Sequence, residues 1–117
     1  MVRVLLVEDS IDCAKAFKTL LGFAGYDVDV AHNYGDAVNL IGNNCNFDLL
    51  ITDINLPDGN GLDLLSKIQG RACKGIVISG DSPRSVKGIN EAGFSVFLQK
   101  PVMFDQLKSV IAGVLDA

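Results

Sequence analysis

Five residues whose side chains could bind ions or react each follow or end a short apolar run of this sequence. They are Glu8, Asp9, Asp53, Ser79 and Lys100. Three carboxylates brought together raise one another's pKa values unless a cation joins them. Oxygen ligands with no Cys or His beside them favour a hard ion such as Mg²⁺, and a lysine and a serine hydroxyl can contact phosphoryl oxygens. Gathered in space, these residue types predict a Mg²⁺-assisted phosphoryl site, with Asp53 as the best candidate nucleophile.

The elements that must position these residues can be predicted from hydrophobic periodicity. Apolar runs predict five strands, at 2–7, 26–31, 47–52, 75–79 and 94–99. Ser10 is a suitable cap for the helix that follows the first strand, and Gly25 is a natural end for it. Apolar residues at helical spacing predict five helices in all; their positions are Ala14, Phe17, Leu20, Leu21 and Ala24, then Tyr34, Ala37, Val38 and Ile41, then Leu62, Leu65 and Ile68, then Val86, Ile89 and Ala92, and finally Leu107, Val110, Ile111 and Val114.

Strands that alternate with helices imply an α/β fold, in which a doubly wound five-stranded parallel sheet carries helices on both faces. Ligands of such sheets bind at the carboxyl ends of the strands. The five candidate residues follow the first, third, fourth and fifth predicted strands, so this rule brings them to one edge. The second strand ends in Ala31 and His32 and offers nothing comparable. His32 has no cluster of carboxylates or cysteines beside it, so we expect no metal-binding role for it.

Length and composition restrict the class of protein. The chain has 117 residues, of which 49% are apolar and 21% are charged, so we expect one compact domain over residues 1–117. A net charge of −4 argues against direct nucleic-acid binding and against membrane insertion. Cys13, Cys45 and Cys73 lack metal-type spacing and favour unpaired thiols. The apolar run near the start is too short for a signal peptide, which favours a cytoplasmic location.

Four segments in order resemble the receiver domain of two-component response regulators; they read LLVEDS, DLLITDINLPDGNGLDLL, GIVISG and FLQKPV. The resemblance spans essentially the whole chain and implies the flavodoxin-like strand order 2-1-3-4-5. It implies that Glu8 and Asp9 hold Mg²⁺ together with Asp53 and the backbone carbonyl of Asn55. It also implies that Asp53 is the phosphoacceptor, and that Lys100 precedes a cis peptide bond to Pro101.

The same resemblance implies a switch and a partner. Ser79 matches the switch hydroxyl of the family, and Phe97 matches the aromatic residue whose rotamer follows it. The donor would be the phosphohistidine of a histidine kinase or of a histidine phosphotransfer domain. The chain would then be a signalling phosphoacceptor rather than an enzyme, although it would assist its own Mg²⁺-dependent phosphorylation and dephosphorylation. Phosphorylation of Asp53 would shift the Ser79 and Phe97 face and so control an output.

Two other classes of protein compete with this interpretation. A phosphatase or phosphotransferase of the haloacid dehalogenase type also uses an aspartate nucleophile, but it usually needs a second aspartate two residues later, where this chain has Asn55. An interaction module of the same fold that no longer accepts phosphate would typically lack one of the acids or the lysine. The output also stays open: a stand-alone regulator, a transcription-factor receiver and the receiver of a hybrid histidine kinase are all compatible with the sequence.

Overall fold

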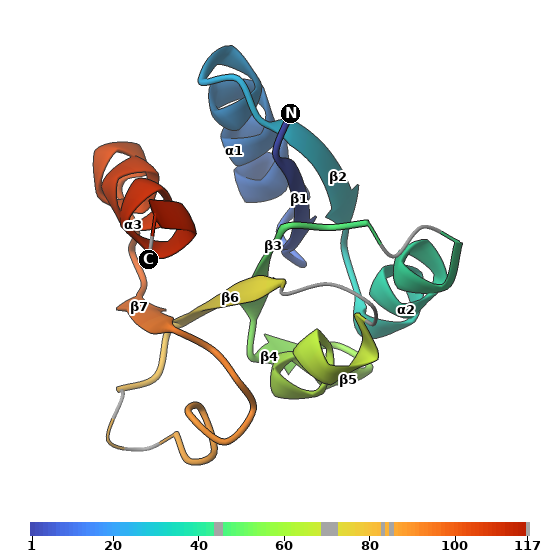
Figure 1. Cartoon of the computed structure of the whole chain (residues 1–117). Helices are drawn as coiled ribbons and strands as arrows, with labels where there is room; N and C mark the ends of the chain where they lie inside the picture. The colour runs from blue at the N-terminus through green and yellow to red at the C-terminus, as the bar shows by residue number, and fades with distance from the viewer. Residues whose placement is uncertain (44–45, 69–72, 83, 85, 117) are drawn as a thin grey trace.

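The computed structural model describes residues 1–43, 46–68, 73–82, 84 and 86–116, and its centre is a parallel β-sheet (Figure 1). Five strands form the sheet in the order β2-β1-β3-β6-β7. These are the five predicted strands in the predicted order 2-1-3-4-5, so the doubly wound fold class is confirmed. The strand bounds are Arg3–Val7 for β1, Asp27–Ala31 for β2, Leu49–Asp53 for β3, Lys74–Ser79 for β6 and Val96–Gln99 for β7.

Three of the predicted helices form where the periodicity places them. They are α1 (Ile11–Phe23), α2 (Tyr34–Asn43) and α3 (Phe104–Asp116). The Ser10 hydroxyl caps α1 by accepting a hydrogen bond from the backbone N–H of Cys13, which satisfies one of the free donors of the first turn. Gly25, just beyond the end of α1, has φ +96°, a conformation that other residues rarely adopt.

The third and fourth predicted helices are wrong as α-helices. Leu62 and Leu65, expected in the third helix, lie in two 3₁₀ segments, and the last predicted position, Ile68, follows them. A short hairpin precedes these segments. The bounds are Asn55–Leu56 for β4, Gly59–Asn60 for β5, Gly61–Asp63 for η1 and Leu65–Lys67 for η2. Where the fourth was expected, residues 86–88 have no regular secondary structure and residues 89–93 form turns. Gly88 lies inside this stretch at φ +85°, and a left-handed residue ends a right-handed helix.

Two apolar layers enclose the sheet, because successive side chains of a strand point to opposite faces. Leu5 and Val7 of β1 pack with α2 and the 3₁₀ segments, whereas Val4 and Leu6 pack with α1 and α3. Figure 1 shows the same division, with α1 and α3 on one side of the sheet and α2 on the other. All five residues of the central strand β3 are buried, so the end of this strand is held rigidly.

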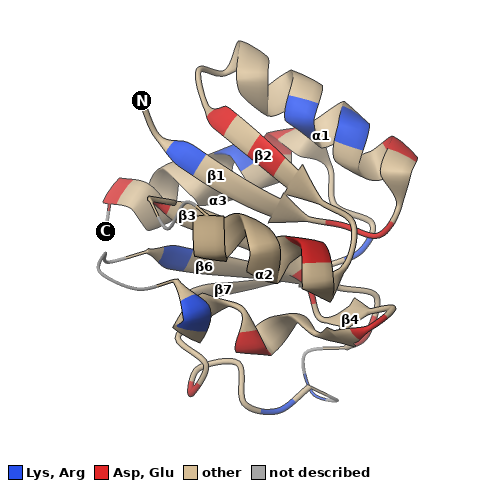
Figure 2. Ribbon diagram, turned by 90° about the vertical axis from the view of Figure 1, so that its right-hand side faces the viewer, with Lys and Arg blue, Asp and Glu red and all other residues tan. Residues whose placement is uncertain are grey.

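Charged residues gather at the start of the outer strand β2. Figure 2 shows two acidic residues on β2 beside a basic residue on β1. The Arg3 guanidinium of β1 lies 2.7 Å from Asp29 and 3.4 Å from Asp27. Among the helices within the described ranges, none is both long enough and apolar enough to cross a bilayer.

Candidate functional site

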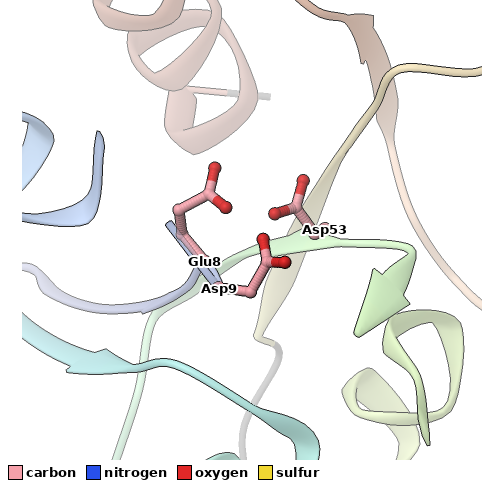
Figure 3. Close-up of side chains that lie close together, drawn as sticks. All are labelled: Glu8, Asp9 and Asp53. Atoms are coloured by element: carbon pink, nitrogen blue, oxygen red, sulfur yellow. The ribbon is translucent and has the colours of Figure 1, made fainter. Parts of the chain in front are cut away.

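Three carboxylates converge at the carboxyl edge of the sheet. Asp53 is the last residue of β3, and Glu8 and Asp9 directly follow β1, which is the neighbour of β3 in the sheet. One carboxylate oxygen from each residue lies within 4.8 Å of the others. Figure 3 shows the three side chains turned toward one another. Glu8 and Asp53 are each only 5% exposed, whereas Asp9 is exposed. The sequence-based prediction that these acids meet is therefore confirmed in the geometry.

Lys100 supplies the positive charge of this cluster. Its Nζ lies 2.9 Å from Asp53 Oδ1 and 3.3 Å from Glu8 Oε1. Burial acts to lower the pKa of Lys100, but the hydrogen bond and the charge of Asp53, together with Glu8, outweigh it and hold that pKa above its ordinary value. The Lys100–Pro101 peptide bond is cis, as the resemblance implies.

The cluster contains three carboxylates and one ammonium group, and Glu8 is one of its two buried acids. Burial, and then the neighbouring Asp53 side chain, raise the pKa of Glu8 above its ordinary value. The other oxygen of Asp53, Oδ2, is buried and has no hydrogen-bond partner among the described residues. A buried carboxylate oxygen without a donor is costly, and a hard divalent cation held by Glu8, Asp9 and Asp53 would satisfy it. The residues present therefore fit Mg²⁺.

Ser79 and Asn55 border the same site. With Asp9, Asp53 and Lys100 they line a polar pocket of about 160 Å³. The Ser79 hydroxyl accepts a hydrogen bond of 3.0 Å from the backbone N–H of Asp81, so its own proton is free to be donated into the pocket. The Asn55 amide donates to the Asp81 carboxylate at 3.0 Å. This contact between the two side chains was not predicted.

Phe97 lies apart from the pocket. It is half-buried in β7 and packs against the apolar layer on the α2 side of the sheet, with Ile89 and Ala92 beside that layer. Its register partner across the sheet is Val77, two residues before Ser79. Phe97 therefore lies in the strand next to the one that ends in Ser79.

The loop after Asp53 is fixed by contacts that sequence reasoning missed. The backbone N–H of Gly61 donates to the carbonyl of Ile54 at 2.8 Å, and a Cβ atom at Gly61 would lie 1.8 Å from the carbonyl oxygen of Asp53. The Asp58 carboxylate accepts hydrogen bonds from the backbone N–H groups of Tyr34 and Gly35 at 2.7 and 3.0 Å. These two donors, Gly35 first, hold the pKa of Asp58 below its ordinary value. A carboxylate that caps a distant helix leaves no local signal in the sequence.

His32 contacts the acidic loop, although the end of the second strand was expected to offer nothing comparable to the five candidate residues. Its ring nitrogen Nδ1 lies 3.0 Å from the backbone carbonyl oxygen of Glu8. The backbone N–H of Glu8 in turn donates to the carbonyl of Ala31 at 3.0 Å. The available signal was positional: parallel β2 and β1 are neighbours, so residues just beyond their ends must meet.

The chain is thus a doubly wound domain with three acids and a lysine at the carboxyl edge of its parallel sheet. A family model described as the response regulator receiver domain matches residues 4–112. The chain belongs to this family.

Similar proteins agree with this assignment. The response regulator protein PilR of Pseudomonas aeruginosa is 32% identical over 97% of this chain, which corresponds to 26% of PilR. The two-component response regulator ARR12 of Arabidopsis thaliana is 31% identical over 93% of this chain and 19% of its own length. The chain thus matches only a minor part of these relatives. A CheY-like receiver domain of Methanospirillum hungatei has a TM-score of 0.87 at 33% identity, with 99% of this chain and 94% of that one covered.

Proposed function

We propose that this receiver domain, which spans residues 1–117, accepts a phosphoryl group on Asp53 from the phosphohistidine of a partner kinase or phosphotransfer domain. The observation that carries the proposal is the state of the Asp53 carboxylate. It is almost fully buried, with one oxygen 2.9 Å from the Lys100 ammonium and the other without a partner in the described part of the chain. One oxygen can form the new bond to phosphorus while the second stays available to a cation.

The transfer needs little covalent help from the protein. A carboxylate oxygen of Asp53 attacks the phosphorus, the bond from phosphorus to the partner's imidazole nitrogen breaks, and its electron pair returns to that nitrogen. Mg²⁺ held by Glu8, Asp9 and Asp53, with the Asn55 carbonyl as a further ligand, would neutralise the phosphoryl oxygens and orient them. Lys100 stabilises the same negative charge from its position beside Asp53. The domain is a signalling phosphoacceptor rather than a turnover enzyme, because the acceptor is its own side chain.

The readout in this proposal begins at Ser79. Its hydroxyl lines the pocket that Asp53 borders, and it can donate to a phosphoryl oxygen once one is present. Movement of Ser79 toward that oxygen would break its contact with the Asp81 N–H and shift the chain after β6. Phe97, in the neighbouring strand β7, would turn inward and change the face that it forms with β7 and α3. The local charge thereby biases a two-state surface.

The test uses acetyl phosphate with Mg²⁺ and intact-mass measurement. The wild type should gain one phosphoryl group that is labile to acid and to hydroxylamine, as an acyl phosphate is. Asp53→Asn should gain none, whereas Asp63→Asn, an exposed aspartate of η1, should label like the wild type. An acid-stable label, or labelling of Asp53→Asn, would mean that the acceptor is wrong.

The two competing functions predict different results in the same assay. A haloacid dehalogenase-type phosphatase would release phosphate from a simple phosphomonoester over many turnovers. An interaction module without phosphoryl chemistry would stay unlabelled while it folds normally. A receiver domain that accepts phosphate on Asp53 should instead gain one phosphoryl group per molecule without turnover.

A further inference from the structure

His32 holds the backbone of the acidic loop, and the direction of its hydrogen bond is fixed by chemistry. Its half-buried ring follows β2 directly, with Nδ1 at 3.0 Å from the carbonyl oxygen of Glu8. A carbonyl oxygen only accepts hydrogen bonds. Nδ1 must therefore carry the proton and donate it.

The contact completes a set of three bonds around one residue. The Glu8 N–H donates to the carbonyl of Ala31 at 3.0 Å, so both backbone polar groups of Glu8 are held by the end of β2. The Glu8 carboxylate also accepts from the backbone N–H of Ser10 at 3.1 Å. Between these anchored neighbours lies Asp9, whose side chain is exposed.

The carbonyl that His32 holds belongs to the peptide bond between Glu8 and Asp9. Its orientation therefore sets the direction in which both side chains leave the backbone. An exposed carboxylate that must meet two buried ones loses conformational freedom when it does so. A bond that fixes the preceding peptide plane lowers this cost before any cation arrives.

We propose that His32 is a positioning residue for the cation site, acting through the Glu8–Asp9 peptide; this inference rests on the Mg²⁺ site of the proposed function. His32 is not one of the residues whose ligand atoms gather at the site; these are Glu8, Asp9 and Asp53. Groups that orient metal ligands commonly change metal affinity when they are removed.

The geometry specifies which substitutions preserve the effect. In asparagine, Nδ2 is attached at the same distance from Cα as Nδ1 of histidine, so His32→Asn keeps a donor in place. His32→Phe keeps a ring of similar size and removes the donor. His32→Gln keeps an amide but carries it one bond farther, where it cannot reach the carbonyl without moving the chain.

The experiment is a calorimetric Mg²⁺ titration of the metal-free protein, which requires no phosphorylation. His32→Phe should weaken Mg²⁺ binding by about 5-fold, which corresponds to the net contribution of one hydrogen bond. His32→Asn should stay within about 2-fold of the wild type, and His32→Gln should resemble His32→Phe. Equal affinity in all four proteins, or failure of His32→Asn to restore binding, overturns the inference.

A second measurement keeps the inference apart from the function on which it rests. Nitrogen-15 NMR of the wild type near pH 8.5, where an ordinary imidazole is neutral, should find the Nδ1–H tautomer of His32; the Nε2–H tautomer overturns the inference. Acetyl phosphate labelling runs in parallel. Normal labelling with unchanged Mg²⁺ affinity in His32→Phe refutes the positioning role alone. A wild type that neither binds Mg²⁺ nor becomes labelled refutes both proposals.

Discussion

Asp9→Asn should stabilise the protein in the absence of metal. The substitution is nearly isosteric and removes one negative charge whose oxygen lies within 4.8 Å of oxygens of Glu8 and Asp53. Unit charges at this distance repel by roughly 0.9 kcal/mol in water and roughly 3.5 kcal/mol at an effective dielectric of about 20. Asp9 is exposed and Lys100 offsets part of the repulsion, so the lower figure applies. We expect a gain of about 1 kcal/mol in the free energy of unfolding, or about 3–5 °C in the melting temperature.

Mg²⁺ should abolish this advantage. A cation that binds only the folded state stabilises it by RT ln(1 + [L]/Kd), which is about 1.4 kcal/mol at ten times the Kd. Loss of one carboxylate ligand that weakens the site about 10-fold leaves the variant with about 0.4 kcal/mol at the same concentration. The gap of about 1 kcal/mol should therefore close.

The assay is urea unfolding with EDTA and again with Mg²⁺, followed by circular dichroism. Asp63→Asn removes an exposed aspartate outside the cluster and should change neither the metal-free stability nor the response to Mg²⁺. The reasoning is refuted if Asp9→Asn is no more stable than the wild type in EDTA, or if Mg²⁺ stabilises both proteins equally.

Two further predictions concern the loop after Asp53. Gly61→Ala places a Cβ 1.8 Å from the Asp53 carbonyl oxygen and should cost about 2–3 kcal/mol of stability in urea unfolding; Gly113→Ala, a helix position with open space, should instead gain about 0.5–1 kcal/mol. Asp58 has a lowered pKa in the folded state, so its contribution is present above the unfolded-state pKa and is lost as pH falls through the folded one. The stability advantage of wild type over Asp58→Asn should therefore hold at pH 7 and shrink below about pH 4; a gap that does not change with pH would contradict this.

The helices show where periodicity is informative. The stripes of α1, α2 and α3 combine steps of three and four, which only the 3.6-residue period of an α-helix produces. Leu62, Leu65 and Ile68 are spaced by three alone, which equally fits a 3₁₀ helix with three residues per turn. The structure has that form, with the N–H groups of Leu64 and Lys67 bonded three residues back.

The sequence predicts those site residues that lie directly at the ends of strands. Asp53, Lys100 and the two acids after β1 were found because parallel strands end at one edge. His32 and Asp58 were missed because one acts through the backbone of another loop and the other caps a helix 23 and 24 residues earlier in the chain. Side-chain to backbone contacts between distant segments depend on tertiary packing and leave no periodic pattern.

The position of β2 at one edge of the sheet has a consequence for self-association. An edge strand presents one row of unpaired backbone donors and acceptors with which a strand of another molecule could pair. Here that strand carries Asp27 and Asp29, which Arg3 of β1 holds in place through ion pairs of 3.4 and 2.7 Å. An approaching copy of β2 would bring the same two carboxylates against them. Repulsion between these carboxylates disfavours the pairing of two copies of β2 edge to edge.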